Sequence, residues 1–432
     1  MPMKTPPYKL SITAVSAAIA EGELTPKALM ESCLERIAER EPAVKAFAHY
    51  DAEAALDAAR RLPESHGSGA LYGIPVGIKD IIDTADMPTE CNSPIYKGHR
   101  PAQDAVCVAR LREAGAIILG KTVTTEFAST FPGPTRHPRD STRTPGGSSS
   151  GSAAAVGDCM LPLALGTQTG GSMIRPSAFN GVVGYKPAWG LFDTTGVKPL
   201  AVGLDTIGFM VRSLDDVPVV SGVLADRTPS VPVAVETPKI AVVRSADWDT
   251  ADPETQTLLE ETAERLGKAG AVVRDVALPA PFEQISPGQR IVMAYQASEA
   301  FEHEWEHHRD ALSESFRSLI ERGLEITAAE RKEVMATREQ CRTQLPDLFA
   351  PGEVILTPSA VGEAPLGLHS TGDSVFNRTW TALHVPCLTV PVTDGPHGLP
   401  LGVQFVEPRR DEATLLGTAR WAALALSLPV FG

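Results

Sequence analysis

The sequence predicts an α/β fold in which helices and strands alternate in layers. Residues 104–120 have the pattern of a helix followed directly by an apolar strand, and residues 239–278 have the pattern of strand, helix and strand. Two further apolar runs, at 353–358 and 386–392, are typical of buried strands. Such alternation favours a layered α/β architecture. The length of 432 residues alone would favour two or three domains.

Three other stretches have a helical pattern. Thr25 is a suitable N-cap and Pro26 is tolerated in the first turn, so we expect a helix from there to about residue 40. A second helix is expected over 51–62, and the charged stretch 296–347 is predicted to be helical as well. We find no internal repeat and no low-complexity segment.

A glycine-rich region interrupts this alternation. The apolar run 73–80 predicts a strand that carries Lys79. Further on, the segment 144–186 is dense in Gly, Ser, Thr and Ala and has few charges. Flexible linkers lack apolar anchors, whereas this segment contains AAAV and MLPLALG, so it must be packed. We therefore expect an active site here rather than a linker.

The composition excludes several classes of function. The formal net charge of −14 disfavours binding to nucleic acid or to an anionic membrane. The six cysteines show no CxxC spacing, which is typical of reduced thiols. The N-terminal 22 residues have only a short apolar stretch, too short for a membrane span and unlike a signal peptide. We expect a cytoplasmic protein.

Two short motifs match known patterns but fit poorly. Residues 115–122 match the phosphate-binding Walker A pattern, yet the residues between its glycines are Ala, Ile, Ile and Leu, which favour a strand. Residues 303–307 match the zinc-binding pattern H-E-x-x-H, with His303 and His307 as ligands and Glu304 as base. Their surroundings are highly charged and typical of a solvated helix, so we expect neither a nucleotide nor a metal.

Two serine loops carry the predicted chemistry. Ser148 lies in the run PGGSSSGS (145–152), and Ser172 closes the turn GTQTGGS (166–172), which is 172 − 148 = 24 residues later. A serine directly after two glycines suits a nucleophile, because the glycines let the backbone turn sharply. Successive N–H groups can then point at one spot and form an oxyanion hole.

A serine nucleophile needs a base, and the sequence indicates a lysine. Neither loop contains a histidine. A lysine works as a base only when it is neutral, and burial in an apolar strand lowers its pKa. Lys79, in the run GIPVGIKD, has such a setting. A lone buried lysine more often pairs with an acid, but the lysine strand and the two serine loops together form a strong pattern.

In these pieces the chain resembles the amidase signature family. The resemblance rests on GIPVGIKD, LREAGAIILGKT, TPGGSSSGSAAAV and LALGTQTGGSMIRPSAFNGVVGYKP, with FNRTWTALHVPCLTVPV and GLPLGVQFV near the C-terminus. It implies one α/β/α domain over 1–432 with a large mixed sheet, a signature core at about 70–215 and a variable helical region at about 280–350. It also implies that no metal or organic cofactor is needed.

The resemblance also implies roles for single residues. Ser172 falls on the nucleophile, Ser148 on a bridging serine that follows a cis peptide bond, and Lys79 on the general base. Thr169, Gly170 and Gly171 fall on the backbone donors of the oxyanion hole. Neutral Lys79 would withdraw the proton of Ser172 through Ser148 as an amide carbonyl is attacked, and the same relay would return a proton to the leaving ammonia or amine.

The chain departs from the common family form T-D-x-G-G-S-I-R at two places. Gln168 stands at the acid position, and Ile174 stands at the arginine position, with the arginine one residue later as Arg175. Joint loss of an ion pair would explain both changes. This variant is similar to malonamidase-type amidases, in which the shifted arginine binds the substrate carboxylate. Pro176 favours an extended backbone at Arg175, from which a bidentate carboxylate clamp could be made.

These observations predict hydrolysis of a small carboxylate-bearing amide such as malonamate, with Arg175 and Gly147 binding the substrate. A neutral aryl or alkyl amide, a carbamate or a biuret-like compound is the first alternative. The second is a non-hydrolytic component of an assembly, since the A subunits of glutamine amidotransferases share the family core and deliver ammonia to partner proteins. The malonamidase resemblance also suggests a homodimer.

Overall fold

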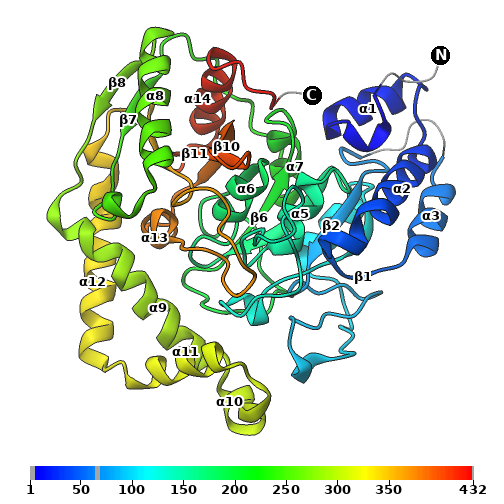
Figure 1. Ribbon diagram of the computed structural model, residues 1–432, viewed down its shortest axis with the longest axis horizontal. Coiled ribbons are helices and arrows are strands. Elements are labelled where there is room, and N and C mark those ends of the chain that lie inside the picture. The colour runs from blue at the N-terminus through cyan, green and yellow to red at the C-terminus, as the bar shows by residue number, and fades with distance from the viewer. Residues whose placement is uncertain (1–4, 64–68, 431–432) are drawn as a thin grey trace.

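Eleven strands join into one mixed sheet in the computed structural model, which describes residues 5–63 and 69–430 (Figure 1). Their order across the sheet is β1-β3-β2-β4-β6-β5-β10-β11-β9-β7-β8. The strands are β1 (Phe47–Tyr50), β2 (Pro75–Lys79), β3 (Ile117–Thr122), β4 (Leu163–Gln168), β5 (Val183–Lys186), β6 (Thr206–Val211), β7 (Lys239–Val242), β8 (Val272–Asp275), β9 (Glu353–Pro358), β10 (Cys387–Asp394) and β11 (Pro400–Val406). The length-based expectation of two or three domains is wrong, because one continuous sheet joins both halves of the chain.

Helices cover this sheet, and the α/β prediction is confirmed. They are α1 (Ile12–Ala20), α2 (Pro26–Val44), α3 (Ala52–Arg61), α4 (Val106–Glu113), α5 (Ser150–Gly157), α6 (Ile174–Asn180), α7 (Asp216–Leu224), α8 (Pro253–Lys268), α9 (Ile285–Ala300), α10 (Glu302–His308), α11 (Glu314–Glu325), α12 (Ala328–Gln344), α13 (Val375–Ala382) and α14 (Glu412–Ala425). Thr25 caps α2 as predicted, since its side chain accepts a hydrogen bond from the backbone N–H of Ala28. Residues 1–4 of the N-terminal segment lie outside the described residues.

Three parallel strands place the catalytic candidates. β2 lies between β3 and β4 and runs parallel to both, with Ile78 opposite Leu165 of β4. The carboxyl ends of parallel neighbours meet at the same edge of a sheet. Lys79, the last residue of β2, therefore lies beside the end of β4 and the glycine turn that follows it.

The core is divided between the two faces of the sheet. In β4, Leu163 and Leu165 belong to one buried cluster, whereas Ala164 between them packs on the other face with Ala153 of α5 and Met210 of β6. Alternate side chains of a strand point to opposite faces, so a strand buried on both faces is apolar throughout. This explains why the Ala-rich segment after Ser148 is a buried helix, α5.

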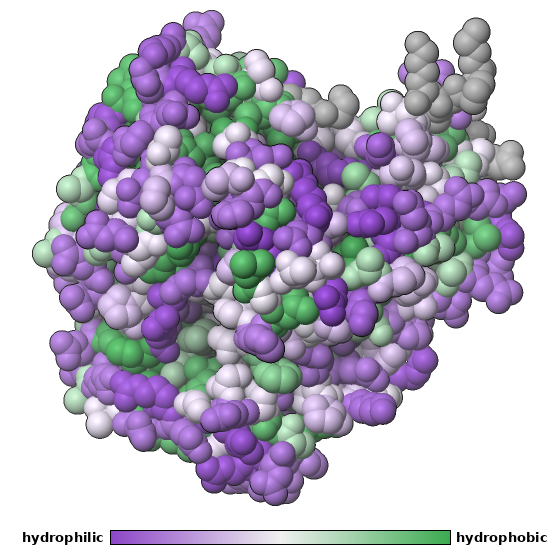
Figure 2. Space-filling model, in the orientation of Figure 1, coloured by the Kyte–Doolittle hydropathy of each residue, from purple (hydrophilic) through white to green (hydrophobic). Residues whose placement is uncertain are grey.

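Helices α9–α12 form the predicted helical region and stand together at one side of the molecule, away from α1–α3 (Figure 1). The face seen in Figure 2 is covered mostly by hydrophilic residues, with apolar residues scattered in small groups. This surface agrees with the acidic composition. Within residues 5–63 and 69–430, none of the helices has the length and apolar character that a membrane span requires.

Candidate active site

Lys79 is wholly buried at the end of β2, and its Nζ lies 2.7 Å from both Ser148 Oγ and Thr167 Oγ1. Burial lowers the pKa of Lys79 to about 7, and the charge of Asp205 opposes this shift in part. No carboxylate is within ion-pair distance of Lys79 among the residues that the structure describes. The side chain is therefore suited to accept a proton near neutral pH.

Ser148 lies in the loop before α5, and the peptide bond between Gly147 and Ser148 is cis. The Ser148 side chain is buried and contacts Lys79, while its backbone oxygen accepts a hydrogen bond from the N–H of Thr125 at 3.3 Å. The chain brings Lys79 and Ser148 together from 69 residues apart. The sequence predicted this contact.

Ser172 follows β4 and lines a cavity of about 300 Å³ together with Thr169, Gly170 and Gly171. None of the described residues accepts a hydrogen bond from the backbone N–H groups of residues 169–172. A side chain at position 171 would not fit, since a Cβ atom there would collide with Asn377 Oδ1. Unpaired N–H groups beside a serine in a cavity are the arrangement that an oxyanion hole requires.

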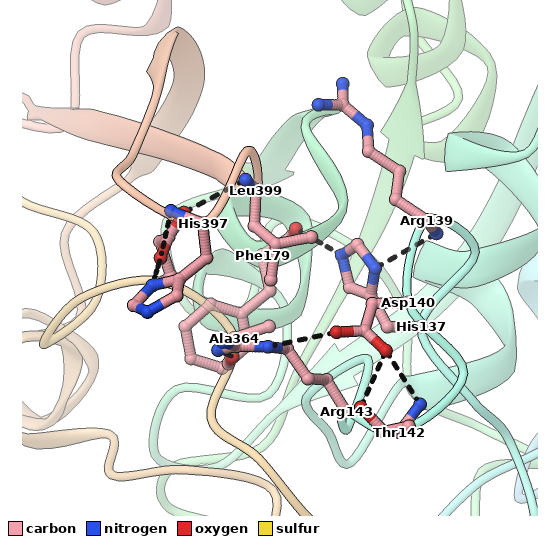
Figure 3. A network of polar contacts seen from close by, with 10 residues as sticks. His137, Arg139, Asp140, Thr142, Arg143, Phe179, Ala364, His397 and Leu399 are labelled. Atoms are coloured by element: carbon pink, nitrogen blue, oxygen red, sulfur yellow. Dashed lines mark hydrogen bonds and ion pairs between the residues drawn. The ribbon is translucent and has the colours of Figure 1, made fainter.

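A hydrogen-bond network anchors the segment that leads into the Ser148 loop (Figure 3). The ring of His137 bonds the carbonyl oxygen of Phe179 at 2.8 Å, and Arg143 Nη1 donates to the carbonyl oxygen of Ala364 at 2.6 Å. Arg143 also pairs with Asp140. Residues 137–143 are thus hydrogen-bonded to α6 and to the segment that leads to Thr371. These contacts fix the Ser148 loop, α6 and the Thr371 segment relative to one another.

Gln168 replaces the family acid with a neutral hydrogen-bonding group. Its Oε1 accepts the backbone N–H groups of Met173 at 2.8 Å and Ile174 at 3.1 Å, and its Nε2 donates to Thr381 Oγ1 at 2.9 Å. Ile174 itself is buried in an apolar cluster with Ala201 and other side chains. The surroundings of position 174 are thus apolar side chains and offer no site for a charged arginine. This agrees with joint loss of an ion pair.

Arg175 lies in α6, so the extended backbone predicted from Pro176 is wrong. Pro176 lies in the first turn of the helix, where its missing N–H has no intrahelical partner to lose, and this outweighs the restriction on the preceding residue. Burial lowers the pKa of Arg175 to about 10. Its Nη2 donates to the Gly147 carbonyl at 2.6 Å and to Thr371 Oγ1 at 3.0 Å.

Two of the three guanidinium nitrogens of Arg175 have no acceptor among the described residues. Nε is buried and has no partner, and Nη1 bonds no acceptor among the described residues. Arg175 lines the same cavity as Ser172, whereas Gly147 is not among the residues that line it. The structure thus places Gly147 behind the arginine rather than in the cavity wall.

Four charged groups around this cavity were not predicted from the sequence. Arg290 of α9, Arg378 of α13 and Asp373 line it, and Arg378 pairs with Asp373. Asp205 does not line the cavity; it is half-buried and accepts hydrogen bonds from Thr169 Oγ1 at 2.5 Å and from the backbone N–H groups of residues 200 and 201. Burial raises the pKa of Asp205 to about 6. Arg378 lies within the family-like run FNRTWTALHVPCLTVPV and Asp373 lies just before that run, but no pattern assigned a role to either of them. The other two residues come from distant segments.

The two rejected motifs have structural roles. Most of the Walker-like segment forms β3, and its Lys121 is buried in an ion pair with Asp80 at 3.2 Å. Glu304 of the H-E-x-x-H match bonds Lys198 at 2.5 Å and the hydroxyl of Tyr96 at 2.6 Å. Both polar groups are thus committed to contacts within the protein.

Known proteins match the chain along nearly its whole length. The family model described as Amidase matches residues 28–416. The A subunit of glutamyl-tRNA(Gln) amidotransferase from Chloroflexus aurantiacus is 31% identical over 465 residues, covering 95% of each chain. Its counterpart from Acidothermus cellulolyticus is 38% identical over 292 residues, 61% of this chain and 58% of that protein. The crystal structure of an amidase superimposes with a TM-score of 0.88 at 29% identity, covering 96% of this chain and 99% of the other. The chain therefore belongs to the amidase signature family.

Proposed function

We propose that this protein hydrolyses a small amide that carries a free carboxylate, such as malonamate, to the acid and ammonia. The proposal rests on one observation above all. The cavity beside Ser172 is lined by Arg175, whose Nη1 has no acceptor among the described residues. A guanidinium with unpaired donors next to a nucleophile is suited to bind an anionic group of the substrate.

The charge around the cavity supports the same substrate class. Three arginines (175, 290 and 378) and one aspartate (373) line it, in a protein whose formal net charge is −14. A local excess of positive charge in a cleft attracts an anionic substrate. Because Nη2 of Arg175 already bonds Gly147 and Thr371, the substrate carboxylate would be held by Nη1 together with a donor from another residue. The simple bidentate clamp is thus replaced by a composite site.

In the proposed mechanism Lys79 acts as a neutral base. It takes the proton of Ser148 while Ser148 takes that of Ser172, and Ser172 Oγ attacks the amide carbonyl carbon. The N–H groups of the 169–172 turn hold the oxyanion. Collapse breaks the C–N bond, the relay returns the proton to nitrogen, and ammonia leaves. Water activated by the same relay then attacks the acyl-enzyme, and the acid is released as Ser172 regains its proton.

A matched pair of substrates tests the carboxylate site. Malonamate and propionamide have the same length and differ in the carboxylate. We expect Arg175→Ala to lower kcat/KM for malonamate about 10- to 100-fold more than for propionamide, the loss expected for a hydrogen bond to a charged group. Equal losses for the two amides would refute the carboxylate site.

A second experiment tests the nucleophile. The Ser172→Ala variant should form no acyl-enzyme by intact-protein mass spectrometry, and retained turnover would refute the assignment of Ser172 as the nucleophile.

An amidotransferase component of the A type is the second candidate, favoured by the names of the two curated relatives. Such a protein should copurify with partner proteins and release ammonia from glutamine. We expect instead that the chain purifies without partner proteins, as a homodimer by light scattering, and prefers malonamate to glutamine. A stable heteromeric complex with glutaminase activity would favour the amidotransferase role. A preference for propionamide, a carbamate or biuret over malonamate would favour the neutral-substrate alternative.

A further inference from the structure

Two side chains distant in sequence hold the turn that carries the N–H groups of residues 169–172, and one of them, Gln289, also lines the cavity. Gln289 Nε2 of α9 donates to the carbonyl oxygen of Thr169 at 2.8 Å. Thr381 Oγ1 of α13 donates to the carbonyl oxygen of Gly170 at 2.7 Å. These carbonyls belong to the peptide units whose N–H groups are those of Gly170 and Gly171. Each peptide unit is thus bonded at its oxygen, while its N–H has no acceptor in the part of the chain that the structure describes.

The direction of both hydrogen bonds follows from the network. A carbonyl oxygen can only accept, so the amide nitrogen of Gln289 must face Thr169. Gln168 Oε1 accepts two backbone N–H groups, so its Nε2 must face Thr381 and donate to it. The hydroxyl of Thr381 can therefore donate its own proton to the carbonyl oxygen of Gly170. The carbonyl oxygen of Asn377, at 3.0 Å, is the only other acceptor for this proton among the described residues.

From this geometry we infer that Gln289 and Thr381 are positioning residues that set the direction and strength of the oxyanion hole. A hydrogen bond accepted at a peptide oxygen polarises the amide and strengthens donation from its N–H. It also holds the plane of the peptide, which otherwise turns freely in a Gly-Gly sequence. The inference rests on the proposed serine mechanism, in which these N–H groups stabilise the oxyanion.

Gln168 acquires a specific function from this arrangement. An aspartate at that position could only accept a hydrogen bond, and Thr381 would then donate to it instead of to Gly170. The amide of Gln168 donates to Thr381 and so directs the Thr381 proton to the oxyanion turn. Gln289 links α9 to the reaction and Thr381 links α13 to it, although neither helix carries a residue of the proposed catalytic triad.

The test uses the rate at which Ser172 is phosphonylated by an alkyl fluorophosphonate, followed by intact-protein mass spectrometry. In this reaction Ser172 Oγ bonds to phosphorus and fluoride leaves. The phosphoryl oxygen carries charge in the transition state, as the oxyanion of an amide would, so the rate reports on the oxyanion hole without a natural substrate. Gln289→Met and Thr381→Val each remove one donor at nearly constant volume. Gln296→Met on α9, which bonds the N–H of Gly203, and Thr379→Val on α13 are the matched controls. Thermal unfolding monitors the fold of each variant.

We expect the maximal phosphonylation rate to fall about 10-fold or more in Gln289→Met and Thr381→Val, with the half-saturating probe concentration nearly unchanged. Loss of a whole oxyanion donor costs about 100-fold, and a weakened donor costs less. Thr381→Ser, which keeps the hydroxyl, should restore the rate, and the control variants should match the wild type. A folded Gln289→Met or Thr381→Val protein with the wild-type rate, or no rescue by serine, would overturn the inference. Labelling of Ser172→Ala at the wild-type rate would instead overturn the proposed function.

Discussion

The amino group of Lys79 and the hydroxyl of Ser148 form a buried pair, with Nζ and Oγ 2.7 Å apart and both side chains inside the protein. Charged lysine in such a place is costly, since neither partner of Nζ is a carboxylate. The pair is therefore suited to pass a proton rather than to stabilise the fold, and the first two predictions follow from this difference.

The pH dependence of kcat/KM should report the protonation of Lys79. The base works only when neutral, so activity should fall as the pH drops through about 7, the pKa to which burial lowers Lys79. The Asp205 carboxylate favours charged Lys79. Asp205→Asn should thus shift the acidic limb of the kcat/KM profile to lower pH. Asp193→Asn, at an exposed site, should leave that limb unchanged. An unshifted limb in Asp205→Asn would contradict the coupling between Lys79 and Asp205.

Lys79→Met should abolish activity and raise stability. Between the folded-state pKa of about 7 and the unfolded-state pKa of about 10.4, folding must remove the proton of this lysine, and below about 7 it must bury the charged group. The penalty is full below the folded pKa of about 7, and it fades as the pH rises toward the unfolded value. The gain in unfolding free energy should therefore be larger at pH 6 than at pH 9, as measured by urea denaturation.

Lys121→Met provides the contrast for this prediction. Lys121 is as deeply buried as Lys79, but it pairs with Asp80 at 3.2 Å. Its removal leaves a buried carboxylate without its partner, which typically costs about 3–5 kcal/mol. Equal destabilisation by both lysine substitutions would contradict the distinction between a catalytic and a structural lysine.

Restoring the family's acid and arginine should be cooperative. Ile174→Arg alone places a guanidinium in an apolar cluster, and Gln168→Asp alone removes the amide that bonds Thr381. Position 168 contacts the backbone of residue 174, so the double variant can form an ion pair. A double-mutant cycle on unfolding free energy should yield a coupling of about 0.5–3 kcal/mol. Strict additivity would argue against joint loss of an ion pair.

Glu304 should matter for stability and not for a metal. Glu304→Ala removes hydrogen bonds to Lys198 and Tyr96, so we expect a loss of about 1.5–3 kcal/mol in unfolding free energy. His303→Ala and His307→Ala should change neither stability nor activity, since both rings lie on the exposed side of α10. Zinc-dependent activity that His303→Ala removes would support the metalloprotease alternative instead.

Local patterns accounted for several elements and contacts. Thr25-Pro26 began a helix as predicted, and the apolar run before Lys79 formed a buried strand. The prediction failed where a local preference met a specific tertiary setting. Pro176 disfavours helix at Arg175, yet α6 begins at Ile174 and includes Arg175, helped by the bonds of Gln168 to the backbone N–H groups of residues 173 and 174. Five strands, β1, β4, β5, β6 and β11, were not predicted as strands from the sequence.

The amino-acid sequence alone was enough to predict the serine turn, the lysine strand and the family, because glycine spacing and apolar runs are local and leave a pattern along the chain. Packing in three dimensions decided what surrounds them. Asp205, Gln289 and Thr381 support the turn from three separate segments, and Arg290 and Arg378 join Arg175 from two different helices. Such contacts depend on how helices dock on the sheet, and a docking position is set by the whole core rather than by any short stretch of sequence.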